Sequence, residues 1–414
     1  APVAITVAAS RMTPSGGAVR GALQATIAAL GPGGGTVRLP AGRFAVSDLK
    51  IGGGVRLIGA GAGRTVLVAS TTPDEDAVEV TGHDVLISDL SIDDGGTGST
   101  PDGSAVIFVH DAEDVVLRRL SLVHLRGYGV EVLGHHERIS VQQSTIDGDG
   151  RGLIGVAEWS EDASSSDVSV VRCVIRNLSK YGVLLQSFFN GHTWPHRRAL
   201  AYGNDISQIH DSAIHDGTIE IGIWLAGANG AALDNLVRDT GWDGIETVVN
   251  ATSPTVAGNV IRDTRTGIYV ENVTRDALIE QNDIAGVSVA GINLEPPHGG
   301  PQSGHLTIRQ NRVVGAGIYG IGTGPGTLGS RITGNQVLDS GKMAILLDGA
   351  SGNVVEGNDL RDRRKPARQA WCVYDPQTRG STTRNSVQNN DCSGSLNGGS
   401  TDPAEFSARR GATP

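Results

Sequence analysis

Four carboxylic acids in the second half of this 414-residue chain have the types and spacing needed to cleave a glycosidic bond. Glu246, Glu271 and Glu295 each follow a Gly-Ile pair within a few residues, and Asp243 lies just before Glu246. Glycosidic cleavage uses one carboxyl group that protonates the leaving oxygen and a second that acts as nucleophile or activates water. Crowding raises the pKa of one such acid, which keeps it protonated. We therefore expect these four residues to be catalytic.

Side chains suited to holding a sugar lie near these acids or in two long insertions. Residues 186–203 gather aromatic and basic side chains in a chain poor in aromatics, and residues 295–305 form the second insertion. Both insertions begin at the end of a predicted strand of the Gly-Ile type, so they should overhang the same face. We therefore expect them to form the walls of a cleft. The expected substrate-binding residues are Trp224, Tyr269, Asn293, Trp194, His192, Arg197, Arg198, His210, His215 and Asp216.

Two of these, His210 and His215, flank aspartates. A histidine beside an aspartate acts either as a base with an orienting acid or as part of a metal site. No third ligand clusters with them in the sequence, so we expect no metal and no cofactor.

The acids also have a purely structural interpretation. Exposed strand positions in soluble proteins favour charged residues, so some acids would line up by chance. The Asp243-Gly244 pair is also ordinary turn chemistry. Both interpretations stay open at the level of the sequence.

A repeat supplies the elements that would position the acids. Its marker is an asparagine followed two residues later by an aliphatic residue and, in most units, by a later Gly-Ile pair. The markers are Asn235, Asn259, Asn282, Asn311, Asn335 and Asn358, at intervals of 24, 23, 29, 24 and 23 residues. Such units are too short for helical hairpins and fit coils of strands stacked about 4.8 Å apart. We expect the asparagines to pair from coil to coil and to adopt the left-handed backbone conformation.

Alternation within the repeat predicts which side chains face outward. In residues 267–271, Ile268 and Val270 should face the core and Tyr269 and Glu271 the outside. Glu271 and Glu295 should then be neighbours about 5 Å apart at the backbone, with Glu246 one coil earlier.

Extending the repeat upstream predicts an all-β parallel β-helix of about eleven or more coils. A solenoid grows lengthwise without a second core, so we expect one domain over residues 1–414. Within it we expect a capping helix at 13–32, coils at 36–360, and a last coil with a C-terminal tail at 361–414.

Composition narrows the class of partners. The 59 glycines indicate many turns, and the net charge of −10 argues against nucleic acid and anionic membranes as partners. No apolar run approaches the ~20 residues that span a bilayer. The start at Ala1-Pro2 resembles a processed terminus, so we expect a mature, secreted chain after signal-peptide removal.

Three cysteines allow at most one disulfide. Cys372 and Cys392 are 20 residues apart, about one coil, so they could face each other on adjacent turns. Three free thiols are an equal alternative. Cys173 falls at a repeat marker, where a buried apolar residue is expected.

The N-terminal third resembles a known superfamily. An amphipathic segment, then GGGTVRLPAG and GVRLIGAGAGRTVL, is similar to the start of the pectin-lyase-like right-handed parallel β-helices. Over about residues 13–150 it is most similar to the catalytic module of mannuronan C5-epimerases. The resemblance implies a right-handed helix, and oligomers such as a homotrimer.

The epimerase motif itself is incomplete. Its Tyr-Gly start is present at Tyr128-Gly129, and Glu131 approximates its acid, but its Asp-Pro-His phrase is missing. Residues 152–155 replace its second acid. Epimerase activity therefore does not carry over with the fold.

These observations predict a secreted glycoside hydrolase or transglycosidase acting on a polysaccharide or oligosaccharide. An acid-lined site should favour a neutral glycan, such as a fructan, over polyuronates. One alternative is a lyase or C5-epimerase on uronic acid polymers, with Tyr128, His210 or His215 as base and Arg197 or Arg198 neutralising the carboxylate. Another is a non-catalytic, tailspike-like glycan-binding module.

Overall fold

The computed structural model is a right-handed parallel β-helix of about eleven turns, which confirms the predicted fold class. It describes residues 3–6, 20–69, 75–96, 103–160, 166–186, 188–189, 192–193, 198–210, 219–271, 274–295, 303–375 and 385–397. The chain divides into two compact units, Ala1–Ile223 and Trp224–Pro414, and each is described by itself. The organisation as one domain stays a prediction.

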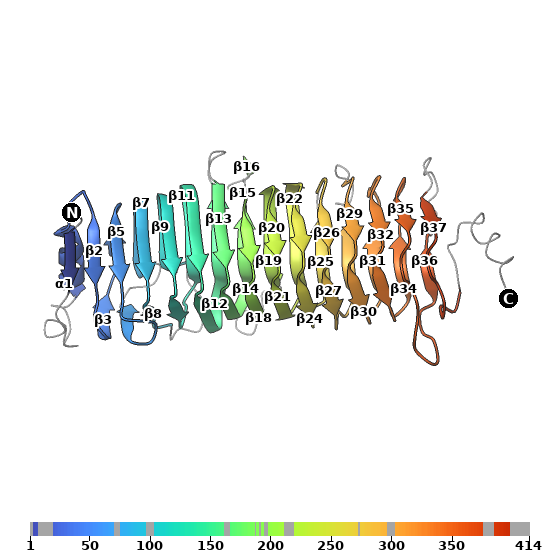
Figure 1. Cartoon of the computed structure of the whole chain (residues 1–414). Helices are drawn as coiled ribbons and strands as arrows, with labels where there is room; N and C mark the ends of the chain where they lie inside the picture. Colours follow the sequence, from blue (N-terminus) through green and yellow to red (C-terminus); the bar gives the residue numbers. More distant parts are fainter. Residues whose placement is uncertain are drawn as a thin grey trace. The chain divides into compact units, whose positions relative to one another are not determined.

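In the first unit the strands of successive coils pair in parallel (Figure 1). One sheet contains β1 (Val3–Thr6), β2 (Gly35–Arg38), β5 (Val55–Ile58), β7 (Val78–Ser88), β9 (Ala105–Arg118), β11 (Tyr128–Gln142), β13 (Ser166–Val171) and β17 (Leu200–Tyr202). A second contains β3 (Gly42–Val46), β6 (Thr65–Ala69), β8 (Ser91–Asp93), β10 (Ser121–Val123), β12 (Thr145–Ser160), β14 (Val174–Gln186) and β18 (Asp205–Ile209). The third begins at β4 (Leu49–Ile51) and continues through the first halves of β7, β9 and β11 and the later parts of β12 and β14.

The second unit has three narrower parallel sheets. The first contains β20 (Ala231–Leu233), β23 (Thr255–Ala257), β26 (Leu278–Glu280), β29 (Thr307–Arg309), β32 (Arg331–Thr333), β35 (Val354–Glu356) and β37 (Ser386–Gln388). The second contains β21 (Leu236–Thr240), β24 (Val260–Arg262), β27 (Asp283–Ala285), β30 (Arg312–Val314) and β33 (Gln336–Leu338). The third begins at β19 (Ile221–Ala228), of which the part from Trp224 belongs to this unit, and contains β22 (Asp243–Thr252), β25 (Thr266–Glu271), β28 (Ala290–Glu295), β31 (Tyr319–Thr323), β34 (Met343–Leu347) and β36 (Trp371–Tyr374).

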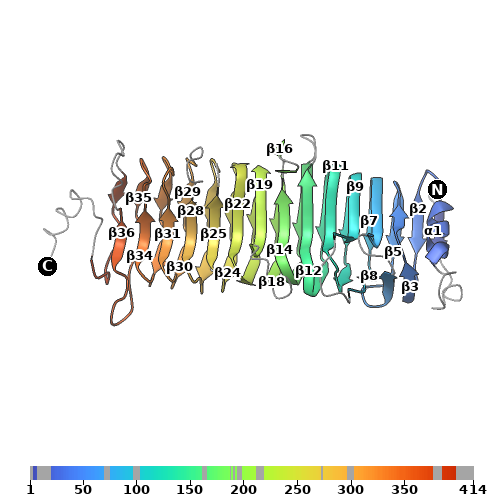
Figure 2. The same cartoon turned by 180° about the vertical axis from the view of Figure 1, so that it is seen from behind.

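A short helix, α1 (Arg20–Ala28), lies beside the first coils of its unit (Figure 2). Leu23 and Ile27 are one helical turn apart, and both are buried. The helix therefore covers apolar surface at the first coils, as a solenoid end requires. Residues 7–19, where we expected it to begin, lie outside the described part of the chain.

A ladder of buried asparagines runs through the second unit. Asn259 donates from Nδ2 to Oδ1 of Asn282 at 2.9 Å, and Asn282 donates in the same way to Asn311 at 2.8 Å. The predicted pairing is thus confirmed, and it extends to Asn390 beyond the last repeat marker. The left-handed backbone was placed wrongly, because it falls on the preceding residue, as at Gln281 with a φ of 55°. That residue makes the corner, which leaves the asparagine free to turn its amide inward.

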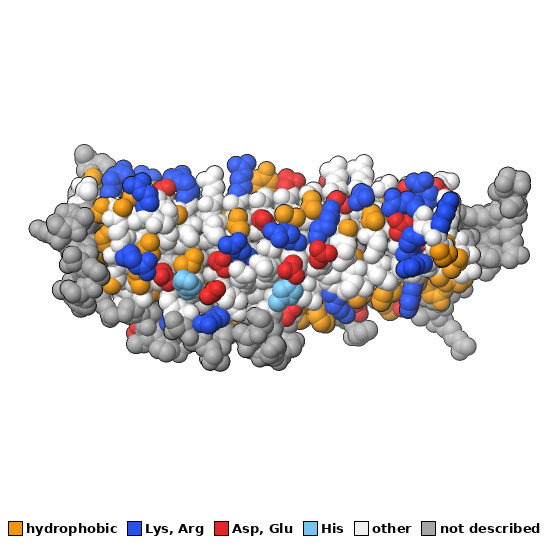
Figure 3. Space-filling model, turned by 90° about the horizontal axis from the view of Figure 1, so that it is seen from below, with side chains coloured by type: hydrophobic (Ala, Val, Ile, Leu, Met, Phe, Trp, Pro, Cys, Tyr) orange, Lys and Arg blue, Asp and Glu red, His pale blue; other side chains and the backbone are white. Residues whose placement is uncertain are grey.

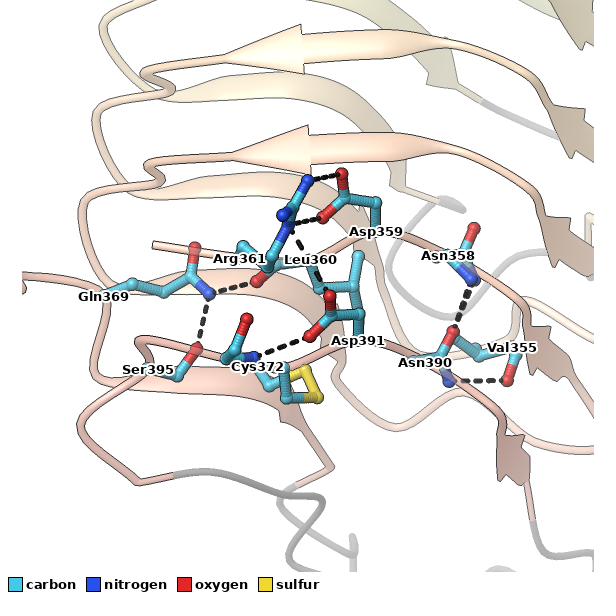
Figure 4. Close-up of a disulfide and its surroundings, with 12 residues drawn as sticks. Val355, Asn358, Asp359, Leu360, Arg361, Gln369, Cys372, Asn390, Asp391 and Ser395 are labelled. Carbon is cyan, nitrogen blue, oxygen red and sulfur yellow. Dashed lines mark hydrogen bonds and ion pairs between the residues drawn. A yellow bond between two sulfur atoms is a disulfide. The ribbon is translucent and has the colours of Figure 1, made fainter. Parts of the chain in front are cut away.

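The last described coil holds a disulfide between Cys372 and Cys392, with Cα atoms 5.3 Å apart (Figure 4). Of the two alternatives left open by the sequence, the structure contains the bridge. Cys173 is free and buried, as expected. Arg361 binds Asp359 beside the bridge, at 2.6 Å from Nε to Oδ1.

Candidate active site

The third sheet of the second unit brings the predicted acids onto three adjacent strands. Glu246 on β22 pairs with Tyr269 on β25, which pairs with Asn293 on β28. Two residues further along, Glu271 pairs with Glu295. The register predicted from alternation is therefore present, and it follows from the buried aliphatic residues that alternate with these positions on each strand.

Glu246 and Asp243 are far more buried than an outward strand position and a turn predict. Their exposed fractions are 2% and 1%. Three of their carboxyl oxygens have no hydrogen-bond partner among the described residues. These are Oδ1 and Oδ2 of Asp243 and Oε2 of Glu246. A buried polar atom without a partner is costly and rare, and it is a common mark of a functional site. Their burial and their unpartnered oxygens thus distinguish these two acids from the exposed charged residues that are ordinary on a strand.

Burial changes the protonation of both acids. It raises the pKa of Glu246 to about 10, with further contributions from the charge of Asp243 and from a hydrogen bond with Glu271. It also raises the pKa of Asp243 to about 7, while the nearby Thr266 hydroxyl and the Arg265 charge oppose the rise. Glu246 therefore keeps its proton at neutral pH, and Asp243 loses its proton at a higher pH than an ordinary aspartate.

Glu295 is held by two neighbours on its outer face. The Tyr269 hydroxyl donates a hydrogen bond of 3.1 Å to Oε2 of Glu295, and Nδ2 of Asn293 donates to the same oxygen at 3.3 Å. Burial and the adjacent Glu295 and Glu271 charges raise the pKa of Tyr269, so its hydroxyl stays protonated. The Glu295 carboxylate is thereby oriented by two uncharged hydrogen-bond donors, a phenol and an amide, which leave its negative charge in place.

Three residues that the sequence patterns did not single out complete the cluster. The Arg265 guanidinium lies 3.9 Å from the ring centroid of Trp242, in a cation–π contact. Tyr319 on β31 has its pKa raised to about 12 by burial and by the charge of Glu295. Trp242 lies in the turn immediately before β22. The sequence Gly241-Trp242-Asp243-Gly244 at this turn was the available signal for a tryptophan beside the acids.

The other predicted substrate-binding residues are only partly described. Trp224 is half-buried on β19, which lies beside β22. Arg198 and His210 belong to the first unit, where Arg198 makes an ion pair with Asp167 at 2.7 Å. The residues whose side chains lie outside the described part are Trp194, His192, Arg197, His215 and Asp216. The insertion 186–203 contains an antiparallel pair, β15 (Phe188–Phe189) with β16 (His192–Thr193).

A second buried carboxyl group lies in the first unit. Burial raises the pKa of Glu131 to about 7, and the charge of Asp76 adds to the rise. Tyr128, three residues earlier on β11, also has its pKa raised by burial. These are the positions at which the epimerase motif is partly kept.

In comparisons with known proteins, the sequence matches one family model, and the structure matches many solved structures. The sequence model of the family described as periplasmic copper-binding protein (NosD) matches residues 197–404. No curated protein sequence matches this chain at a significant level. Among the described residues, no helix is long and apolar enough to cross a membrane.

Solved β-helices share the fold at low identity. The A-module of mannuronan C-5 epimerase AlgE4 from Azotobacter vinelandii is 17% identical, with a TM-score of 0.51 over 92% of this chain and 93% of that one. The surface adhesin PfbA of Streptococcus pneumoniae is 12% identical, with a TM-score of 0.57 over 82% and 89%. The Dettilon tailspike protein is 13% identical, with a TM-score of 0.53 over 90% and 68%. The resemblance to epimerase modules noted in the sequence is thus confirmed for the fold.

Proposed function

This chain belongs to the family described as periplasmic copper-binding protein (NosD), and from that premise we propose that it works outside the cytoplasm as a carbohydrate-active enzyme. We place its reaction centre at Glu246, Asp243, Glu271 and Glu295. The observation that carries the proposal is that one sheet holds both a buried, protonated acid, Glu246 on β22, and a carboxylate held by Tyr269, Glu295 on β28, two strands away.

The copper in the family description does not fit the donors that the structure describes. Copper sites in proteins use histidine, cysteine and methionine ligands. No group of three His, Cys, Asp or Glu side chains in the described ranges is placed to hold a metal ion. Cys372 and Cys392 are bridged, and burial raises the pKa of the Cys173 thiol to about 11, which disfavours the thiolate that a metal needs. We therefore assign no step of the reaction to copper.

The arrangement supports cleavage of a glycosidic bond by two carboxyl groups. Glu246 would donate its proton to the leaving oxygen, since its raised pKa keeps it protonated at neutral pH. Glu295, oriented by Tyr269 and Asn293, would act as nucleophile or activate water. Glu271, which shares a hydrogen bond with Glu246, would receive or return the proton between turnovers.

A neutral glycan suits this centre best. Several carboxyl groups with one nearby arginine, Arg265, would repel a polyuronate in a partly desolvated site. The exposed Trp242 ring offers a flat surface beside the acids for the face of a sugar. The fold likeness to a mannuronan epimerase adds that a right-handed β-helix accommodates a polysaccharide.

A glycan panel with two readouts tests this proposal. The purified chain would be incubated with neutral and uronate polysaccharides, following new reducing ends and ultraviolet absorbance. We expect reducing ends without absorbance, lost in Glu246→Gln and Glu295→Gln. The matched control is Glu280→Gln, which removes a surface ion pair with Arg309 in the same unit. Full activity in both active-site variants would contradict the assignment.

A uronate lyase or epimerase is the second candidate, favoured by Glu131 and Tyr128 in the first unit. The pKa of Glu131 is raised to about 7, which suits a general base, and Tyr128 lies three residues earlier on the same strand. Ultraviolet-absorbing unsaturated ends, lost in Tyr128→Phe but kept in Glu246→Gln, would select the lyase, because only elimination forms a double bond at the new end. Binding without any product would favour a non-catalytic glycan-binding module.

A secreted location and a homotrimer are further parts of the proposal. The family description supports a location outside the cytoplasm. Light scattering of the purified chain would decide the oligomeric state, and a monomer at micromolar concentration would contradict the trimer.

A further inference from the structure

A charged groove of about 740 Å³ lies on the first unit. Its lining includes Arg56 on β5, Leu86 on β7, and Val116 and Arg118 on β9. It lies on the second halves of β7 and β9, past the register shift in their pairing. Glu131 lies on the first half of β11, so the groove belongs to a different sheet.

The floor of the groove is apolar and its ends are basic. Arg56 pairs with Leu86, and Leu86 pairs with Val116, so these side chains stack across three strands. Arg118 follows Val116 by two residues and therefore points to the same side. Strands β5 and β9 are two strand spacings apart, about 10 Å. Two guanidinium groups thus flank a half-exposed apolar strip.

Several arginines in the unit bind a carboxylate, whereas Arg56 and Arg118 have no carboxylate partner in the part of the chain that the structure describes. Arg43, Arg119 and Arg176 bind Asp93, Asp89 and Asp147, respectively. Neither Arg56 nor Arg118 makes a hydrogen bond or ion pair with a side chain in the described ranges, and Nε of Arg118 is buried without a partner.

A shortage of acids does not explain this lack of partners, because the chain has 44 acidic and 34 basic residues. On the face seen in Figure 3, basic and acidic side chains are interspersed. Asp89, the acid whose pKa Arg118 lowers by its charge, is bound by Arg119 through both of its oxygens instead. Asp114, which also lines the groove, is bound in the same way by Arg138. A buried guanidinium nitrogen without a partner calls for an anionic ligand.

We infer that this groove binds a linear anionic polysaccharide that carries carboxylate or sulfate groups. Arginine forks pair with both groups through two parallel hydrogen bonds. The Leu86 and Val116 side chains between them would contact the apolar face of a sugar ring. No aromatic side chain lines the groove, so the stacking platforms used to bind single-stranded nucleic acid are absent from its described lining. The inference does not depend on the proposed function, because the groove belongs to another unit and sheet.

Binding of fluorescently labelled oligosaccharides to the full chain tests this inference. The probes are an oligouronate from alginate and an oligosaccharide of chondroitin sulfate, with dextran as the neutral control and oligothymidylate as the nucleic-acid control. We expect both anionic glycans to bind more tightly than dextran and oligothymidylate, with affinity falling as salt increases. Dextran binding as tight as the anionic glycans, or tighter binding of oligothymidylate, would overturn the inference.

Matched arginine variants locate the site. Arg56→Gln and Arg118→Gln should each weaken binding by about tenfold, since a hydrogen bond between charged groups contributes strongly to affinity. Arg119→Gln is the control, because Arg119 neighbours Arg118 in the chain but binds Asp89. Its affinity should stay within about twofold of the parent chain. Equal affinities for all three variants would overturn the inference. Arg56 is exposed, so Arg56→Gln should fold normally and keeps the test valid if Arg118→Gln folds poorly.

Discussion

Tyr269 and Glu295 lie on adjacent strands and are joined by a 3.1 Å hydrogen bond from the phenol to the carboxylate. Tyr269 itself pairs with Asn293, two residues before Glu295. The tyrosine thus reaches diagonally across the sheet to hold the acid of the next coil. This contact distinguishes Glu295 from Glu271, its direct partner in the register.

Replacing Tyr269 by phenylalanine should lower catalytic activity by about tenfold or more, since a hydrogen bond to a charged group contributes about 1.5–3 kcal/mol. The loss should appear in kcat rather than KM if the bond matters most in the transition state. Tyr374→Phe is the control, because Tyr374 lies on β36 of the same sheet and three strands beyond β28. Unchanged kcat in Tyr269→Phe would remove Glu295 from the proposed mechanism.

Glu246→Gln should stabilise the protein at alkaline pH. Because the pKa of Glu246 is raised from 4.5 to about 10, the folded state keeps a proton that the unfolded chain releases above pH 4.5. Stability therefore falls as pH rises from about 4.5 towards 10. The glutamine removes this dependence, so the Tm difference between variant and parent should grow with pH across that window. Thermal melting at several pH values measures it, and a constant difference would show that Glu246 ionises normally.

Asn282→Ala should cost about 2–4 kcal/mol of unfolding free energy, because it leaves several buried ladder groups without partners. Asn282 donates to the carbonyl of Val256 and to Asn311, and it accepts from Asn259. Urea denaturation followed by circular dichroism measures the change. Arg309→Ala, which removes a surface ion pair, should cost at most about 1 kcal/mol. Similar losses in both variants would mean that the ladder contributes little.

Replacing both Cys372 and Cys392 by serine should destabilise the last coil by about 3 kcal/mol, the cost of freeing a loop of this length. Terminal repeats of a solenoid unfold locally, so the effect should be confined to nearby strands. Hydrogen exchange at Val373 and Val387 should accelerate, whereas exchange at Ile268 should not. Cys173→Ser serves as the control for loss of a thiol outside the bridge.

Local sequence was sufficient to predict the coils and their register. Aliphatic residues at every second position, such as Ile268 and Val270, fix which side of a strand is buried, and a slip of one residue would turn them all outward. The asparagine spacing sets the length of each coil. Together these two regularities predict Glu271 opposite Glu295, and the observed strand pairing confirms that position.

The sequence by itself thus determined the parallel β-helix and the strand that carries each acid, because these depend on local alternation and on the coil period. Only the tertiary structure decided that Glu246 is buried and protonated and that Glu295 is held by Tyr269. It also placed Arg265 against Trp242 and left Arg56 and Arg118 without carboxylate partners among the described residues. These properties depend on side chains from neighbouring coils, more than twenty residues apart in several cases, whose contacts no local pattern encodes.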